Sequence, residues 1–170
     1  MIHIEPVTEK NVWNICNLHV AESQKNFVAD NKDSIVEAYV TVIDGGTALP
    51  FGIFEDTLPI GFIMFGYSFV EENEIRGVHG NTYSIWRFMI DERYQGKGYG
   101  KKAMQLAIDY IRTFPKGPSE YIYLSYEPGN IGAAALYHSF SFVETGDLDE
   151  DEVIAIRKVY YSSMSMRKKF

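Results

Sequence analysis

A short glycine-rich stretch is the first place where residue types and spacing could perform chemistry. An apolar run ending at Ile90 leads, through a polar tetrapeptide, into Gln95-Gly96-Lys97-Gly98-Tyr99-Gly100, and a helix-like pattern follows. Glycines at a strand-to-helix turn let the backbone approach a ligand, and the N–H groups that begin a helix attract anions. The stretch therefore predicts a site for a phosphate or diphosphate group.

The spacing of these glycines excludes two common phosphate-binding motifs. The P-loop requires Gly, four residues and then Gly-Lys-Ser/Thr, but Gly100-Lys101 is followed by Lys102. The dinucleotide fingerprint requires Gly-x-Gly-x-x-Gly, whereas Gly96, Gly98 and Gly100 alternate with single residues. A nucleotide-binding module, at which ATP would compete for this turn, is therefore disfavoured.

The turn instead resembles the acyl-CoA signature of the GNAT family of acetyltransferases, Gln/Arg-x-x-Gly-x-Gly/Ala, at Gln95, Gly98 and Gly100. A second GNAT pattern, Asn-x-x-Ala-x-x-Leu-Tyr-x-x-x-Gly-Phe, resembles the positions Asn130, Ala133, Leu136, Tyr137 and Phe142. Ser141 stands where that pattern has glycine, a residue that mainly eases the exit from a helix. Two motifs in the right order identify the chain as similar to this family.

The resemblance implies where acetyl-CoA binds. It places the co-substrate between the strand ending at Ile90 and a strand over Tyr121–Tyr126, which splay apart. Backbone groups of Phe88, Met89 and Ile90 would hold the pantetheine arm and polarise the thioester carbonyl. Backbone groups of the turn would hold the diphosphate, which assigns to the cofactor Gln95, Gly96, Lys97, Gly98, Tyr99, Gly100 and Lys101. Asn130, Ala133 and Tyr137 complete the implied cofactor site.

Acetyl transfer to an amine defines the catalytic groups to look for. An alkyl ammonium has a pKa of about 10 and must lose a proton before it attacks the thioester. The reaction then needs stabilisation of an oxyanion and a proton for the departing sulfur. The resemblance makes Tyr137 the acid. Glu127 is the preferred general base, and Glu22, Glu37 and Asp91 remain alternatives.

The acceptor amine is predicted less directly. Residues 87–102 resemble those of bacterial spermine/spermidine acetyltransferases, so a polyamine is the expected acceptor. Glu22, Gln24, Phe27 and Tyr126 are the expected substrate-binding residues, and the acidic stretches 71–74 and 147–152 could bind distal ammonium groups. Acetylation of an aminoglycoside-like drug, an amino acid or a protein N-terminus, and a non-catalytic acyl-CoA sensor, stay open as alternatives.

The elements that must position these residues follow from the hydrophobic periodicity. Alternating and helical patterns in a mixed order predict one α/β domain over 1–170, with a mostly antiparallel sheet flanked by helices. We expect strands at 2–7, 50–55, 59–70, 82–90, 121–126, 141–145 and 153–160. We expect helices at 8–24, 31–42, 95–113 and 130–140, turn-like segments at 71–80 and 146–152, and a loose tail at 162–170.

Composition narrows the partners. The 170 residues carry a net charge of −7, which disfavours a nucleic-acid partner and suits a cationic substrate. Cys16 is the only cysteine, so no internal disulfide is possible and a cytoplasmic location fits. The four histidines show no metal-binding spacing, and no apolar run reaches membrane-spanning length. A homodimer is expected from the resemblance.

Overall fold

The computed structural model describes residues 1–159, so the expected tail at 162–170 lies outside the described residues. One sheet of seven strands has the order β1-β2-β3-β4-β5-β7-β6. The strands are β1 (Ile2–Pro6), β2 (Ala48–Glu55), β3 (Leu58–Ile75), β4 (Val78–Ile90), β5 (Tyr121–Tyr126), β6 (Val143–Asp149) and β7 (Glu152–Lys158). The helices are α1 (Val12–Cys16), η1 (Glu22–Gln24), α2 (Asn31–Ile43), η2 (Glu92–Tyr94), α3 (Tyr99–Ile111) and α4 (Ile131–Ser139).

Neighbouring strands of the described chain run antiparallel except for β4 and β5, which are parallel. Their pairing is short: it begins at Tyr83↔Ile122 and ends at Ile85↔Leu124, although β4 continues to Ile90. Trp86 is an extra residue on β4, because Met64 pairs with Arg87 while the next residue of β3 pairs with Ile85. The expected mixed sheet that splays between two central strands is confirmed.

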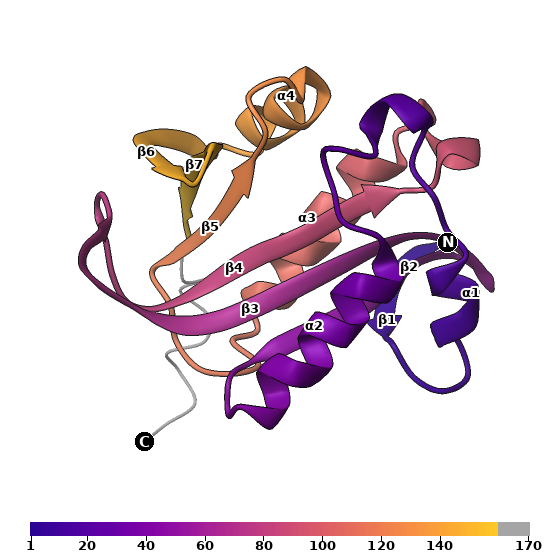
Figure 1. Ribbon diagram of the computed structural model, residues 1–170, viewed down its shortest axis with the longest axis horizontal. Helices are drawn as coiled ribbons and strands as arrows, with labels where there is room; N and C mark the ends of the chain where they lie inside the picture. The colour runs from indigo at the N-terminus through magenta and orange to yellow at the C-terminus, as the bar shows by residue number, and fades with distance from the viewer. Residues whose placement is uncertain (160–170) are drawn as a thin grey trace.

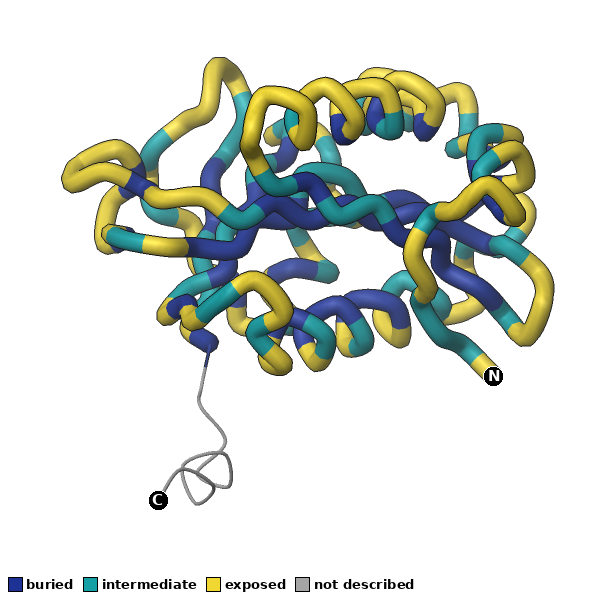
Figure 2. Tube along the Cα trace, turned by 90° about the horizontal axis from the view of Figure 1, so that it is seen from below, coloured by how far each residue is buried: buried dark blue, intermediate teal, exposed yellow. Residues whose placement is uncertain are grey.

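Helices cover both faces of this sheet. Figure 1 shows α2 in front of β2 and alongside β3, with α3 behind β3 and β4, while α4 follows β5 at the upper edge. Seen from below in Figure 2, the buried strands form a middle layer between helices whose outer sides are exposed.

Strand β3 shows why the sheet needs covering on two sides. Its buried run alternates between two cores: Phe62 and Met64 pack with Ile15 of α1, whereas Ile63 and Phe65 pack in the cluster that contains α3. Successive strand residues point to opposite faces, so a strand buried on both faces reads as a continuous apolar run.

The single helix expected over 8–24 is wrong. Only α1 and the short η1 form: α1 ends at Cys16, with Asn17 as its C-cap, and the chain is no longer helical at His19. The backbone N–H of His19 donates to Asp91 Oδ2 at 3.0 Å, and its carbonyl accepts from the backbone N–H of Glu92 at 2.9 Å. Hydrogen bonds to the end of β4 thus replace the hydrogen bonds that would have continued the helix.

Three further boundaries differ from the expectation. The third helix begins at Tyr99 rather than Gln95, because Gly96 and Gly98 have φ angles of 73° and 78°, which a right-handed helix does not allow. Segment 71–80 belongs largely to the β3–β4 hairpin, whose outer part is exposed and therefore polar. Strands β6 and β7 likewise extend into the expected acidic turn.

Candidate active site

The predicted site residues meet at a cavity of about 630 Å³ where β4 and β5 diverge. Its lining comes from five parts of the chain: the segment before α2, the end of β4, the glycine-rich turn, the end of β5 with α4, and the start of β7. The sequence-predicted residues that line it are Gln24, Phe27, Phe88, Met89, Ile90, Gln95, Gly96, Gly98, Tyr99, Gly100, Tyr126, Asn130, Ala133 and Tyr137.

The glycine-rich turn has a geometry that suits a diphosphate. Gly98 is the N-cap of α3 in a left-handed conformation, and a Cβ added there would meet no atom within 4 Å. Backbone N–H groups of the first turn of α3 have no helical partner and carry the positive end of the helix dipole. The hydroxyl of Tyr99 donates to Glu55 Oε2 of β2 at 2.5 Å.

The end of β4 offers backbone groups to an extended ligand. Phe88, Met89 and Ile90 pair with β3 on one side, but no pairing with β5 extends beyond Ile85. In a strand, alternate N–H and C=O groups point toward opposite neighbours, so those on the β5 side of Phe88–Ile90 face the cavity. An amide-bearing chain such as pantetheine has the complementary hydrogen-bonding groups.

Helix α4 positions Tyr137. Asn130 caps the helix, as expected, because its Oδ1 accepts from the backbone N–H of Ala133 at 3.1 Å. At the other end, Phe142 N donates to the Tyr137 carbonyl and Ser141 N to that of His138, the Schellman pattern, with Ser141 at a φ of 64°. This exit packs the ring of Phe142 against that of Tyr137.

The Tyr137 side chain is a buried, protonated phenol at the cavity. It is only 7% exposed, and burial, followed by the charge of Glu152 and the dipole of Tyr126, raises the pKa of its phenol. The group therefore stays protonated at neutral pH. Within residues 1–159, its hydroxyl makes no hydrogen bond to another side chain or to the backbone, which leaves the proton available to a ligand in the cavity.

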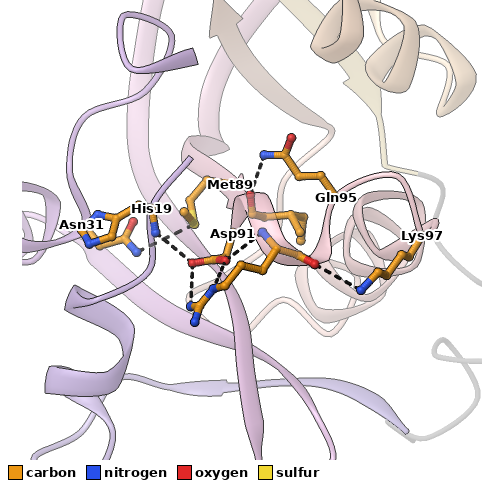
Figure 3. A network of polar contacts seen from close by, with 8 residues as sticks. His19, Asn31, Met89, Asp91, Gln95 and Lys97 are labelled. Atoms are coloured by element: carbon orange, nitrogen blue, oxygen red, sulfur yellow. Dashed lines mark hydrogen bonds and ion pairs between the residues drawn. The ribbon is translucent and has the colours of Figure 1, made fainter. Parts of the chain in front are cut away.

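The buried carboxylate of Asp91 holds the segment at His19 against the end of β4. Asp91 accepts the backbone N–H of His19 and, through Oδ1 at 2.7 Å, the Nε of Arg93 (Figure 3). Burial opposes its ionisation, but the hydrogen bonds from Arg93 and from the backbone of His19 and Arg93 prevail and lower its pKa. Asp91 is thus a structural anchor with saturated oxygens, and it does not line the cavity.

Gln95 connects the two sides of the cavity. Its Nε2 donates to the carbonyl of Ile90 and to Oε1 of Gln24, both at 2.8 Å. The same oxygen of Gln24 accepts the backbone N–H of Ala21, so it orders the segment that carries Phe27. The first residue of the acyl-CoA signature therefore holds the acceptor segment as well as the turn.

Glu152 is an acidic cavity residue to which the sequence analysis assigned no catalytic role. It begins β7, lines the cavity, and its Oε2 accepts a short hydrogen bond from Ser125 Oγ at the end of β5. Its proximity to Tyr137 shows in the effect on the phenol pKa. The sequence placed it only within an acidic stretch; the pairing of Tyr126 with Val153 brings it to the site.

Several predicted residues lie away from the cavity. Glu127 follows β5 but is not part of the lining, and Glu22 is an exposed residue paired with Lys25. Lys97 donates to the carbonyl of Arg93. The remaining two candidates are Lys101, which borders a second cavity, and Glu37, which pairs with Arg87 Nη2 at 2.9 Å.

The described residues hold no group of three or more histidine, cysteine or acidic side chains that could bind a metal ion. Among the helices over 1–159, none is long and apolar enough to cross a membrane.

Comparisons with known proteins identify the family of this chain. The model of the acetyltransferase (GNAT) family matches residues 2–142. The chain is 35% identical over 150 residues to a spermine/spermidine N(1)-acetyltransferase of Bacillus subtilis (strain 168), covering 87% of this chain and 91% of that protein. A probable spermine N(1)-acetyltransferase of Bacillus subtilis subsp. natto is 33% identical over the same length and coverage.

Solved structures share the fold. Spermidine N-acetyltransferase from Vibrio cholerae, in complex with CoA and spermine, matches with a TM-score of 0.66 at 19% identity, covering 92% of this chain and 95% of that one. Aminoglycoside acetyltransferase AAC(6')-Ib in complex with coenzyme A matches with a TM-score of 0.72 at 14% identity, covering 93% and 95%.

The splayed sheet, the glycine-rich turn and the buried tyrosine define an acyl-CoA-dependent N-acetyltransferase. The chain belongs to the GNAT acetyltransferase family.

Proposed function

We propose that this enzyme transfers the acetyl group of acetyl-CoA to a primary amine of a polyamine such as spermidine or spermine. The observation that carries the proposal is the 35% identity, over most of both chains, to a spermine/spermidine N(1)-acetyltransferase. The cavity supports it, because Glu152 contributes to its lining a carboxylate that could attract an ammonium group.

Different residues of the chain have different roles in the proposed reaction. Acetyl-CoA supplies an acetyl group activated as a thioester. The turn at 95–100 binds its diphosphate, and the free edge of β4 orients the pantetheine arm and the thioester carbonyl. Tyr137 donates its proton to the departing sulfur.

Two glutamates are candidates for the general base. The sequence favours Glu127, but Glu152 is the one that lines the cavity, near Tyr137 and hydrogen-bonded to Ser125. A base must approach the amine within hydrogen-bond reach, directly or through one water. We therefore assign proton removal to Glu152 and keep Glu127 as the competing assignment.

Thiol release from acetyl-CoA over a panel of polyamines, aminoglycosides and amino acids tests the acceptor class. Spermine and spermidine should give the highest kcat/KM. For spermine, kcat/KM should fall as salt rises from about 0.05 to 0.5 M, because the screening length shortens, whereas a monoamine should respond much less. Preference for an aminoglycoside or amino acid would contradict the polyamine proposal, and cofactor binding without turnover on any amine would indicate a sensor.

Two isosteric substitutions separate the candidate bases. Glu152→Gln should lower kcat/KM for spermine by about 10²-fold, the scale for losing a general base, with unchanged affinity for CoA. Glu127→Gln is the matched control and should stay within about threefold of wild type. The reverse pattern would assign the base to Glu127 and leave the polyamine proposal standing.

We further propose that the whole chain acts as one domain, in the cytoplasm, and as a homodimer. The continuous sheet supports the first part and the single cysteine supports the second. Sedimentation of the purified protein at micromolar concentration tests the third, and a monomer would contradict it.

A further inference from the structure

The bulge at Trp86 places two neighbouring side chains of β4 on the same face of the sheet. Successive strand residues normally point to opposite faces. Trp86, however, packs against the core cluster that contains Ala38 of α2, and Arg87 Nη2 reaches Glu37 of α2 at 2.9 Å. Both side chains therefore lie on the α2 side, and both residues line the active-site cavity. The bulge thus adds a large aromatic side chain to this side of the cavity.

The backbone of β3 fixes the position of the indole. A Cβ added to Gly66 would lie 2.5 Å from Nε1 and 2.6 Å from Cε2 of Trp86, closer than real Cβ contacts come. The indole therefore lies directly against the backbone of Gly66. Met64, two residues earlier on β3, belongs to the cluster under α2, so this contact is on the same face. A side chain that is ordered before a ligand arrives loses less entropy when the ligand binds.

Trp86 and Ser125 lie at corresponding positions on the two sides of the gap. The parallel pairing of β4 and β5 ends one residue before each of them. Ser125 faces the α2 side, because its neighbours Leu124 and Tyr126 belong to the core on the α3 side. The hydroxyl of Ser125 donates to Glu152. The indole and this carboxylate are therefore on the same face of the sheet, with the gap between β4 and β5 separating them.

The charges around the cavity favour a cation on this face. The lining contains two cationic side chains, and a glutamate outside the lining pairs with each of them. Lys25 pairs with Glu22, and Arg87 pairs with Glu37. Glu152 instead accepts a hydrogen bond from a neutral hydroxyl, and none of the salt bridges among residues 1–159 involves it. The uncompensated charge of the lining is therefore negative.

We propose that Trp86 determines acceptor specificity by binding, against its indole face, the methylene and distal ammonium groups of a polyamine whose reacting amine lies at Glu152. An aromatic face offers apolar contact to methylene groups and cation–π attraction to ammonium groups, and a polyamine has both along its length. The inference rests on the proposed acetylation of polyamines and extends it, because it makes the enzyme prefer a long polyamine to a short diamine.

Steady-state kinetics with spermine and with the short diamine putrescine, at saturating acetyl-CoA, test this preference. Trp86→Ala should raise KM for spermine about tenfold and change its kcat little, because the lost contact is with a part of the acceptor that does not react. The effect on putrescine, which lacks most of that part, should be much smaller. Trp86→Phe keeps an aromatic face and should restore most of the affinity for spermine. Trp13→Ala, which alters an exposed tryptophan of α1, is the control and should match the wild type.

The contact with the indole can also be observed directly. The chain has two tryptophans, so Trp13→Phe leaves Trp86 as the only one. In the complex of this variant with CoA, spermine should change the tryptophan emission at concentrations near its KM. Adding Gly66→Ala should weaken spermine binding, because the new Cβ would displace the indole. In a Trp86→Ala background, the same Gly66→Ala change should have little effect on KM for spermine.

The outcomes separate this inference from the proposed function. Acetylation of spermine by Trp86→Ala with the KM of the wild type would overturn the inference alone, as would an equal rise in KM for spermine and putrescine. Unchanged emission of Trp86 at saturating spermine would also overturn it, and this measurement needs no substitution at Trp86, so it holds even if the alanine variant does not fold. A wild type that acetylates no polyamine would overturn both the inference and the proposed function.

Discussion

The two sides of the active-site cavity are built in different ways. The proposed cofactor side consists mainly of one contiguous stretch, from the end of β4 into α3, which presents backbone groups, with α4 beside it. The proposed acceptor side gathers side chains from three distant segments: Gln24 and Phe27 before α2, Ser125 and Tyr126 on β5, and Glu152 on β7.

This difference explains why one side is recognisable and the other is not. Backbone recognition needs a specific conformation, which only glycine adopts cheaply at Gly96 and Gly98, so the sequence there is constrained. Side-chain recognition needs only that suitable groups meet in space, and many sequences satisfy this. The acceptor side is accordingly where members of one fold can differ in substrate.

The largest effect is expected from a substitution in the glycine-rich turn, on the proposed cofactor side. Gly98→Asp should weaken acetyl-CoA binding by about 10²-fold or more, because the new carboxylate would repel a diphosphate bound at the turn and occupy the space beside it. Gly45→Asp is the matched control: Gly45 also has a left-handed φ, 85°, with open space around it, but it lies in the turn after α2. Calorimetry should show the loss for Gly98→Asp alone. Undiminished binding would place the cofactor elsewhere.

An intermediate effect is expected at the point where the two sides meet. Tyr137→Phe should lower kcat by about 10²-fold and leave the dissociation constant of CoA unchanged, since only the proton donor is lost. Because burial raises the pKa of this phenol, kcat of the wild type should show no loss through tyrosine ionisation up to about pH 10.

Tyr110→Phe provides the control for a buried phenol outside the site. Burial raises the pKa of Tyr110 too, but this residue packs among Phe51 and Phe65 rather than at the cavity. The kcat of the Tyr110→Phe variant should equal that of the wild type. Normal turnover by Tyr137→Phe would mean that water protonates the sulfur or that it leaves as the thiolate.

The smallest effect concerns the helix that both sides share. Ser141 has a φ of 64° at the end of α4, a conformation that costs a residue with a Cβ about 1 kcal/mol. Ser141→Gly should therefore raise the free energy of unfolding by roughly 0.5–1 kcal/mol and the Tm by about 2 °C. Ser139→Gly, two residues earlier within the helix, should instead destabilise the protein by roughly 0.5 kcal/mol. Calorimetric melting that shows no difference between the two variants would contradict the strain at Ser141.

Much of the architecture was predictable because it depends on local patterns. The strand over Tyr121–Tyr126 and the helix beginning near Asn31 were predicted to within one residue, from alternation and helical periodicity. The cap at Asn130 was also predicted correctly, because a cap depends on residues only three positions apart. The helix expected over 8–24 failed because its pattern was overridden by Asp91, more than seventy residues away.

The sequence by itself determined the glycine conformations, the capping of α4 and the order of strands and helices, and hence the family and its co-substrate. These features depend on φ angles and on side chains within a few positions of one another. Only the tertiary structure decided that Glu152 rather than Glu127 lines the cavity. In the sequence, Glu127 directly follows β5 and Glu152 begins β7, so both lie at strand ends. The antiparallel register of β5 and β7 places Glu152 beside Ser125 and Tyr137. A register between distant strands depends on how both pack into the core, which residue spacing does not specify.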